Sequence, residues 1–115
     1  MCEVVINGTT YVPKKTEIDG MECVCIRSYA AGVHVGYLKS KTPTPSGVIV
    51  ELVNSRRIWK WEGAASLSQL AIDGVSGDSR IAKELPLIEI VGVIEIIPLS
   101  EKARTNIYSQ KEWTA

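Results

Sequence analysis

Alternating apolar and polar positions predict strands over most of this chain. Between Met21 and Tyr29 the side chains at odd and even positions belong to opposite faces of a strand, and Val33–Lys39 returns as a second strand after a short turn. Val48–Trp61 begins β-branched and is long enough that we expect a bend or break at Asn54-Ser55. Leu87–Ile97 is rich in Ile and Val, which predicts a strand buried on both faces.

Other segments predict turns, loops and helices. Apolar residues at helical spacing before Gly74 predict a helix over Ala64–Ile72, and Ser100 can cap a second helix over Glu101–Ser109. Prolines and a glycine make Thr42–Gly47 a predicted loop tip, and Val75–Pro86 is expected to be irregular.

The first thirteen residues predict a β-hairpin, because Asn7-Gly8 separates two β-branched runs and suits a turn with positive φ at both central positions. Together these elements predict an α+β fold: a small single domain dominated by an antiparallel sheet, with two short helices and an N-terminal β-hairpin. We expect residues 1–13 to be a hairpin appendage and residues 21–115 to form the α+β domain.

Composition narrows the function classes. The 115 residues suit one domain, and thirteen basic side chains balance thirteen acidic ones, so duplex nucleic acid and anionic membrane are not expected partners. No run of eighteen apolar residues predicts a membrane span, and the N-terminus lacks the pattern of a signal peptide. We expect a homo-oligomer, because Ile-rich strands and Trp113 present more apolar surface than one small core readily hides.

The candidate chemistry lies mainly in Asn54–Trp61. Arg57 shares a predicted strand face with Trp59 and Trp61. A guanidinium that can bind phosphate beside indoles that can stack on bases is typical of nucleotide recognition. The alternative is structural: in a chain without phenylalanine the tryptophans supply core, and the arginines are paired or solvated. The hypothesis adds residues from the first hairpin of the sheet and the start of the first helix. The predicted ligand-binding residues are Arg27, Tyr29, His34, Arg57, Trp59, Trp61 and Ser66.

The sequence gives less support to a catalytic site or a metal-binding site than to a nucleotide-binding site. His34 is the one imidazole, and no serine or cysteine sits in a nucleophile motif beside it. Cys23 and Cys25 should point to one strand face, but a single Cys-x-Cys pair does not complete a zinc site. We expect free thiols, no metal and no cofactor.

Three segments resemble a family of small phage and prophage proteins of unknown function: Ile26–Leu38, Asn54–Ala71 and Ile94–Pro98. The resemblance extends from Val4 to about Lys102 and implies a host bacterial cytoplasm as the compartment. By analogy with phage proteins that sequester the cyclic nucleotide messengers of bacterial defence, we expect a non-enzymatic protein that binds a phosphate-bearing nucleotide. The alternatives are a module that binds a host or phage protein through the tryptophans, and a small hydrolase or cyclase-like enzyme that uses His34.

Overall fold

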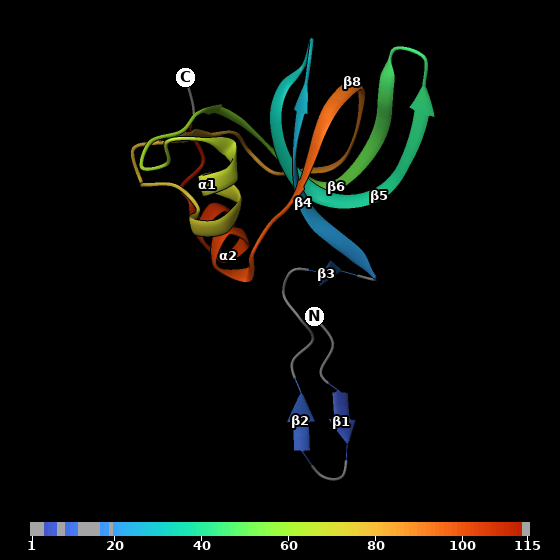
Figure 1. Cartoon of the computed structure of the whole chain (residues 1–115). Coiled ribbons are helices and arrows are strands. Elements are labelled where there is room, and N and C mark those ends of the chain that lie inside the picture. The colour runs from blue at the N-terminus through green and yellow to red at the C-terminus, as the bar shows by residue number, and fades with distance from the viewer. Residues whose placement is uncertain (1–3, 7–8, 12–16, 19, 114–115) are drawn as a thin grey trace.

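Six strands form the main sheet of the computed structural model, and two helices lie beside it (Figure 1). The structure describes residues 4–6, 9–11, 17–18 and 20–113. In chain order the elements are β1 (Val4–Ile6), β2 (Thr9–Tyr11), β3 (Glu17–Ile18), β4 (Met21–Ser28), β5 (Gly32–Thr44), β6 (Gly47–Lys60), α1 (Leu67–Asp73), β7 (Arg80–Ile81), β8 (Leu85–Pro98) and α2 (Glu101–Ser109). This confirms the predicted small α+β fold with an antiparallel sheet.

Four of the strands close into a ring. β4 pairs with β5, β5 with β6, and β6 with the first half of β8, whose second half returns to pair with β4. Every pairing is antiparallel, and Val93 is the register partner of both Val48 and Ser28. β8 changes partner next to Gly92, whose φ of 66° is one that glycine adopts without strain.

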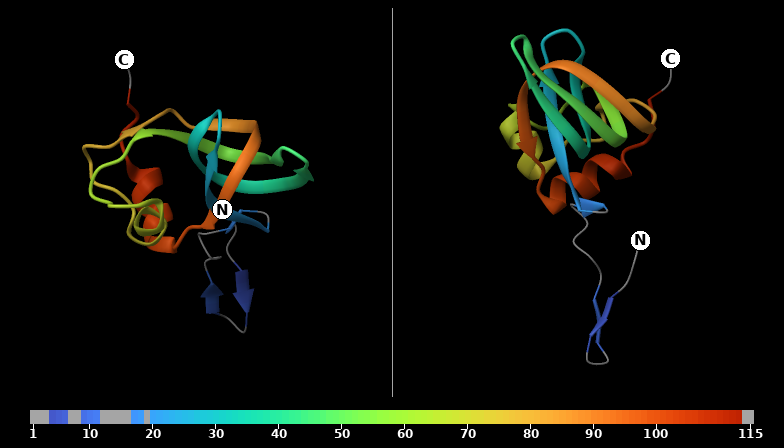
Figure 2. Two further views of the ribbon diagram at one scale, coloured as in Figure 1. Left: turned by 45° about the horizontal axis from the view of Figure 1, so that its top comes forward. Right: turned by 90° about the vertical axis from the view of Figure 1, so that its right-hand side faces the viewer.

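Strand alternation divides the buried side chains between two cores. The inner core fills the ring and consists of Val24, Ile26, Val50, Leu52, Ile90 and Val93. The outer core lies between the outside of the ring and the two helices, which pack on each other at one side of the molecule (Figure 2). Cys23 and Cys25 both belong to the outer core as free thiols, as the shared strand face predicted.

An extra residue in β6 decides which side chains face which core. Tyr37 pairs with Val53, but Val35 pairs with Arg56, so β6 has one more residue than β5 over this stretch. The irregularity includes Asn54, which has a φ of 51°. The bend therefore falls at the predicted place, although the strand continues through it.

Several predicted boundaries were wrong. β5 continues to Thr44 and β6 begins at Gly47, so a two-residue turn replaces the predicted loop over Thr42–Gly47. The Thr44 hydroxyl closes this turn by donating a hydrogen bond to the Gly47 carbonyl oxygen. The first helix begins at Leu67 instead of Ala64, because Ser66 is its N-cap. The second helix is confirmed over Glu101–Ser109.

β7 and β8 also differ from the prediction. The segment predicted to be irregular contains β7 and the start of β8. β8 is not buried on both faces, since Leu87, Val91 and Ile94 are exposed on its outer side. The hydrophobic run Leu87–Ile97 wrongly predicted burial on both faces, because helices cover the outside of the ring on one side only (Figure 1).

At the N-terminus β1 and β2 pair antiparallel, with Val4 opposite Tyr11, as a separate two-stranded sheet. The strands of the predicted hairpin are thus present, while Asn7 and Gly8 of its predicted turn lie outside the described residues. The division into residues 1–13 and 21–115 stays a prediction.

Candidate functional site

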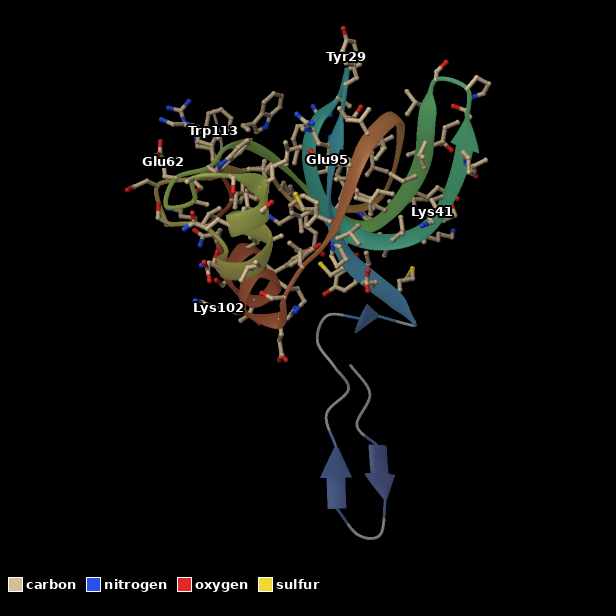
Figure 3. The ribbon with its side chains drawn as sticks, viewed as in Figure 1. Tyr29, Lys41, Glu62, Glu95, Lys102 and Trp113 are labelled. Atoms are coloured by element: carbon tan, nitrogen blue, oxygen red, sulfur yellow. The ribbon has the colours of Figure 1, made fainter. Side chains whose placement is uncertain are left out.

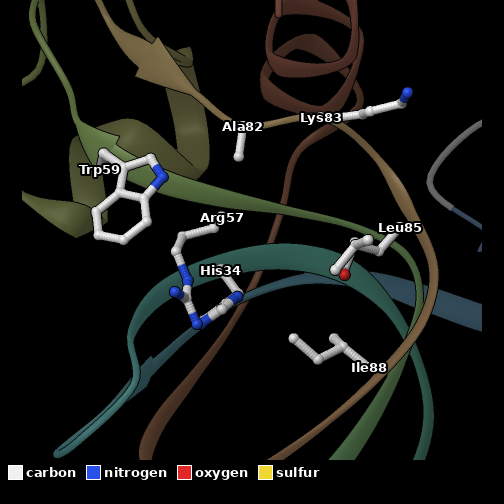
Figure 4. Close-up of a pocket in the computed structure, with 8 residues that line it drawn as sticks. His34, Arg57, Trp59, Ala82, Lys83, Leu85 and Ile88 are labelled. Atoms are coloured by element: carbon white, nitrogen blue, oxygen red, sulfur yellow. The ribbon is translucent and has the colours of Figure 1, made fainter. Parts of the chain in front are cut away.

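His34 and Arg57 are register partners on neighbouring strands, and their side chains lie together in the wall of a pocket (Figure 4). The pocket has a volume of about 330 Å³. It is lined by residues of β5, β6, β8 and the segment that joins β7 to β8: His34, Ser55, Arg57, Trp59, Ala82, Lys83, Leu85 and Ile88. The pocket therefore combines cations, an imidazole and an indole with an apolar floor.

The extra residue in β6 puts Arg57 in this pocket. Leu52 faces the inner core, and strict alternation from it would turn Arg56 inward as well. The register shift at Asn54 reverses that assignment, so that Arg57 faces His34 and Arg56 points toward the helices. A one-residue shift in a strand exchanges its two faces.

Arg56, in contrast, is structural. It is buried, and its guanidinium donates hydrogen bonds to the carbonyl oxygens of Ala82 at 2.8 Å and of Ile107 and Gln110 at 2.9 Å each. These bonds tie the end of α2 to the segment after β7. Because that segment carries Ala82 and Lys83, Arg56 also holds one wall of the pocket in place.

His34 is almost completely buried, with 1% of its surface exposed. Its Nε2 donates to the Ala31 carbonyl oxygen at 2.9 Å, and since a carbonyl can only accept, Nε2 carries the proton. Nδ1 is then a buried acceptor that has no hydrogen-bond partner among the described residues. Desolvation lowers the pKa of His34, and the positive charge of Arg57 lowers it further, against the opposing effect of the Ala31 bond.

Arg57 is a cation without a countercharge. Its guanidinium carbon lies 5.0 Å from the centre of the Trp59 ring, a cation–π arrangement, and it makes no ion pair with any residue that the structure describes. Trp59 is 58% exposed although it is an indole on a strand. An unpaired arginine stacked on an accessible tryptophan can bind a phosphate while the indole stacks on a planar ring.

Three of the seven predicted binding residues meet in this pocket: His34, Arg57 and Trp59. Arg27 does not join them, because it lies on the opposite face of β4 from Ile26, the register partner of His34. Its Nε instead pairs with the Glu95 carboxylate at 2.6 Å. Arg27 and Arg57, both among the predicted ligand-binding residues, therefore do not face the same pocket.

The other three predicted residues also lie elsewhere. Tyr29 stands at the tip of the turn after β4, 90% exposed and pointing away from the ring (Figure 3). Trp61 follows the end of β6 and packs against the outer core, so it does not share the face of Trp59. Ser66 caps α1 by accepting a bond from the Gln69 N–H at 3.2 Å.

Sequence reasoning missed Ser55 and the whole wall formed by Ala82, Lys83, Leu85 and Ile88. Ser55 faces the pocket because of the register shift in β6. The wall residues reach it because β7 pairs with Ile58 and Lys60, and β8 pairs with β6 along most of its length. No local signal marks a two-residue strand such as β7. The one available hint was Lys83-Glu84, a charged pair directly before an apolar strand.

The cysteines of β4 do not supply a nucleophile. Burial raises the pKa of the Cys23 and Cys25 thiols to about 12, so both are protonated near neutral pH. The thiolate is the reactive form of cysteine. These two side chains therefore contribute packing to the outer core.

The fold and the pocket define a small α+β domain with a basic, tryptophan-bearing cavity on one side of a four-strand ring. The family model for a domain of unknown function, DUF6948, matches residues 21–107, and the chain belongs to that family. The match covers the ring, both pocket walls and most of α2. No curated protein and no solved structure matches the chain. Within the described residues, no helix is long and apolar enough to cross a membrane.

Proposed function

We propose that this protein binds a small phosphate-bearing nucleotide in the pocket of His34, Arg57 and Trp59, and holds it without turnover. The observation that carries the proposal is the state of Arg57. It is stacked on an exposed indole, opens to a ligand-sized pocket and has no carboxylate partner in the described structure. A guanidinium in that state is suited to a phosphate, which it can bind through two parallel hydrogen bonds.

The charges around the pocket favour an anion. Arg57 and Lys83 are both in its lining, and none of the eight lining residues is acidic. His34 is neutral near pH 7 and offers the unpartnered Nδ1 as an acceptor, which suits a hydroxyl or amino group of the ligand. Cation, acceptor and indole together match the three parts of a nucleotide: phosphate, ribose or base edge, and base face.

The size of the pocket supports one nucleotide unit. Sites for small molecules are typically on the order of 300–1,000 Å³. At about 330 Å³ this pocket lies near the lower end of that range. We therefore assign it to a single base with its sugar and phosphate.

Binding without turnover is favoured by the surroundings of His34. Nucleophilic catalysis needs a hydroxyl or thiol bonded to a base. Ser55 lines the same pocket, yet Nδ1 of His34 makes no hydrogen bond to it. In the phage setting that the sequence resemblance implies, tight binding alone would sequester a nucleotide messenger of host defence.

Calorimetric titration of the purified protein with cyclic dinucleotides, cyclic trinucleotides and cyclic ADP-ribose isomers tests this proposal. Arg57→Ala should weaken binding by about 1.5–3 kcal/mol, the range for a hydrogen bond to a charged group, while its melting temperature stays close to that of the wild type. Arg27→Ala is the matched control, because Arg27 is an arginine of the opposite sheet face and should leave affinity unchanged.

Two results would count against the proposal. Wild-type protein that binds none of these compounds, nor a mononucleotide, would remove it. Equal losses of affinity in Arg57→Ala and Arg27→Ala would show that the effect is general electrostatics instead of contact in the pocket.

The second candidate is a protein-binding module, favoured by the accessible apolar surface next to the pocket. Trp59, Leu85 and Trp113 are all exposed, and exposed tryptophans are frequent anchors of protein interfaces. A host or phage protein recovered with wild-type protein, and lost with Trp59→Ala, would favour this candidate, provided that nucleotides fail to compete.

A further inference from the structure

A second pocket adjoins the first, and Trp59 lines both of them. The second pocket has a volume of about 320 Å³ and is lined by Trp59, Lys60, Arg80 and Trp113. Trp59 is the one residue in this lining that also lines the first pocket. Two indoles and two cations in one small pocket are the chemistry of a stacked base beside a phosphate.

The second pocket repeats the arrangement of the first. The guanidinium carbon of Arg80 lies 5.3 Å from the centre of the Trp113 ring, as that of Arg57 lies 5.0 Å from Trp59. Arg80 makes no ion pair in the described part of the chain, whereas Lys60 pairs with Glu62 at 3.2 Å. Arg80 is therefore the cation available to a ligand in this pocket.

Trp113 is held in position, although it lies in the segment after the last helix. Its backbone N–H donates to the Ile81 carbonyl oxygen at 2.9 Å, and Ile81 is buried in the outer core opposite Ile58. Arg56 fixes the same region through the Gln110 carbonyl. Trp113 is nevertheless 40% exposed, at the side of the molecule (Figure 3). An accessible side chain on a held backbone has less conformational freedom to lose on binding than one on an unattached tail.

We infer that the second pocket is a subsite for a second base, so that the ligand is a dinucleotide with one base on each side of the shared Trp59 wall. This inference rests on the proposed function, because the first base occupies the pocket of His34 and Arg57. Each pocket alone has room for one nucleotide unit, and each has its own unpaired arginine. Two linked nucleotides would then use both arginines and both exposed tryptophans.

The test compares AMP with the linear dinucleotide pApA by calorimetry, on wild-type protein, Trp113→Ala and Trp113→Phe. We expect pApA to bind wild type more tightly than AMP. Trp113→Ala should weaken pApA by roughly five- to 150-fold, the range for one stacked base, and leave AMP unchanged. Trp113→Phe, which keeps an aromatic face, should restore most of the loss. Both variants retain the backbone bond to Ile81, and thermal melts check that they fold.

The outcomes separate the subsite from the function on which it rests. Equal affinity for AMP and pApA, with no effect of Trp113→Ala, overturns the subsite and leaves the single-nucleotide pocket standing. A loss of the same size for both ligands in Trp113→Ala also overturns it, since Trp113 would then act on the first pocket. Failure of wild type to bind either ligand, or any messenger named above, overturns both inferences.

Discussion

His34 shows how burial and one hydrogen bond set the chemistry of a residue. The bond from Nε2 to Ala31 fixes the tautomer, and desolvation lowers the pKa, so the ring is neutral where a surface histidine begins to be protonated. In the unfolded chain the imidazole has an ordinary pKa near 6.5. The folded state thus binds fewer protons than the unfolded state as pH falls below that value.

Acidification should therefore destabilise the protein through His34. Stability from this residue is complete above about pH 6.5 and is lost as pH falls from there toward the lowered pKa, with a slope of at most about 1.4 kcal/mol per pH unit for one proton. Gln can still donate to Ala31 but does not titrate, so His34→Gln should flatten this part of the profile. Urea unfolding between pH 5 and 8 measures it. Identical slopes for wild type and His34→Gln would contradict the assignment.

At the scale of the element, β6 controls the site through one residue. Its alternation predicted a strand, and the polar pair Asn54-Ser55 predicted where it bends. The sequence also predicted Arg57 and Trp59 on one face, which the structure confirms. Trp61 was assigned wrongly because β6 ends at Lys60, after a second register shift beyond Ile58.

The backbone of Asn54 gives a direct test of the bulge. A β-branched residue is strained at the observed φ of 51°, so Asn54→Val should lower the free energy of unfolding by about 1–2 kcal/mol and weaken nucleotide binding as Arg57 loses its position. Asn54→Gly is the control and should retain binding, because glycine adopts positive φ freely. Denaturant unfolding and calorimetry measure both effects. If Asn54→Gly loses as much binding as Asn54→Val, the side chain of Asn54 matters and the backbone account fails.

Local patterns predicted much of the fold and only part of the site. The strands, the second helix and the shared face of Cys23 and Cys25 follow from periodicity and capping, which are local. The pocket wall of Ala82 and Lys83 does not follow from local patterns. It depends on hydrogen bonds from Arg56 to the carbonyl oxygens of Ala82, after β7, and of Ile107, in α2, which lie far from Arg56 in sequence. Ser66 was misassigned because a capping serine and an anion-binding serine have the same local sequence.

In the whole molecule, one side of the ring of strands carries exposed apolar side chains that the helices do not cover. Three exposed large apolar side chains lie on the outer side of β8: Leu87, Val91 and Ile94. The helices cover the outer core, against which Ile97 near the end of β8 packs, and leave those three side chains exposed (Figure 2). Contiguous exposed apolar surface usually marks an interface.

We accordingly expect a homo-oligomer that uses this side of β8. Light scattering at micromolar concentration should give a mass above that of the 12.6 kDa chain, and the double substitution Leu87→Lys with Val91→Lys should shift it toward the monomer. Tyr29→Ser is the control, since Tyr29 is more exposed than either residue but lies at an isolated tip. A monomeric wild type would remove the prediction.

The ligand that the protein carries from the cell shows whether the Arg57 pocket holds a phosphate-bearing nucleotide. Wild type, Arg57→Ala and Arg27→Ala are purified from cells that express the cyclases of bacterial defence systems, heated, and the released small molecules are identified by mass spectrometry. We predict one nucleotide messenger, in near-stoichiometric amount, from wild type and Arg27→Ala, and little from Arg57→Ala. Release of no nucleotide from wild type, or of equal amounts from all three proteins, would contradict the account.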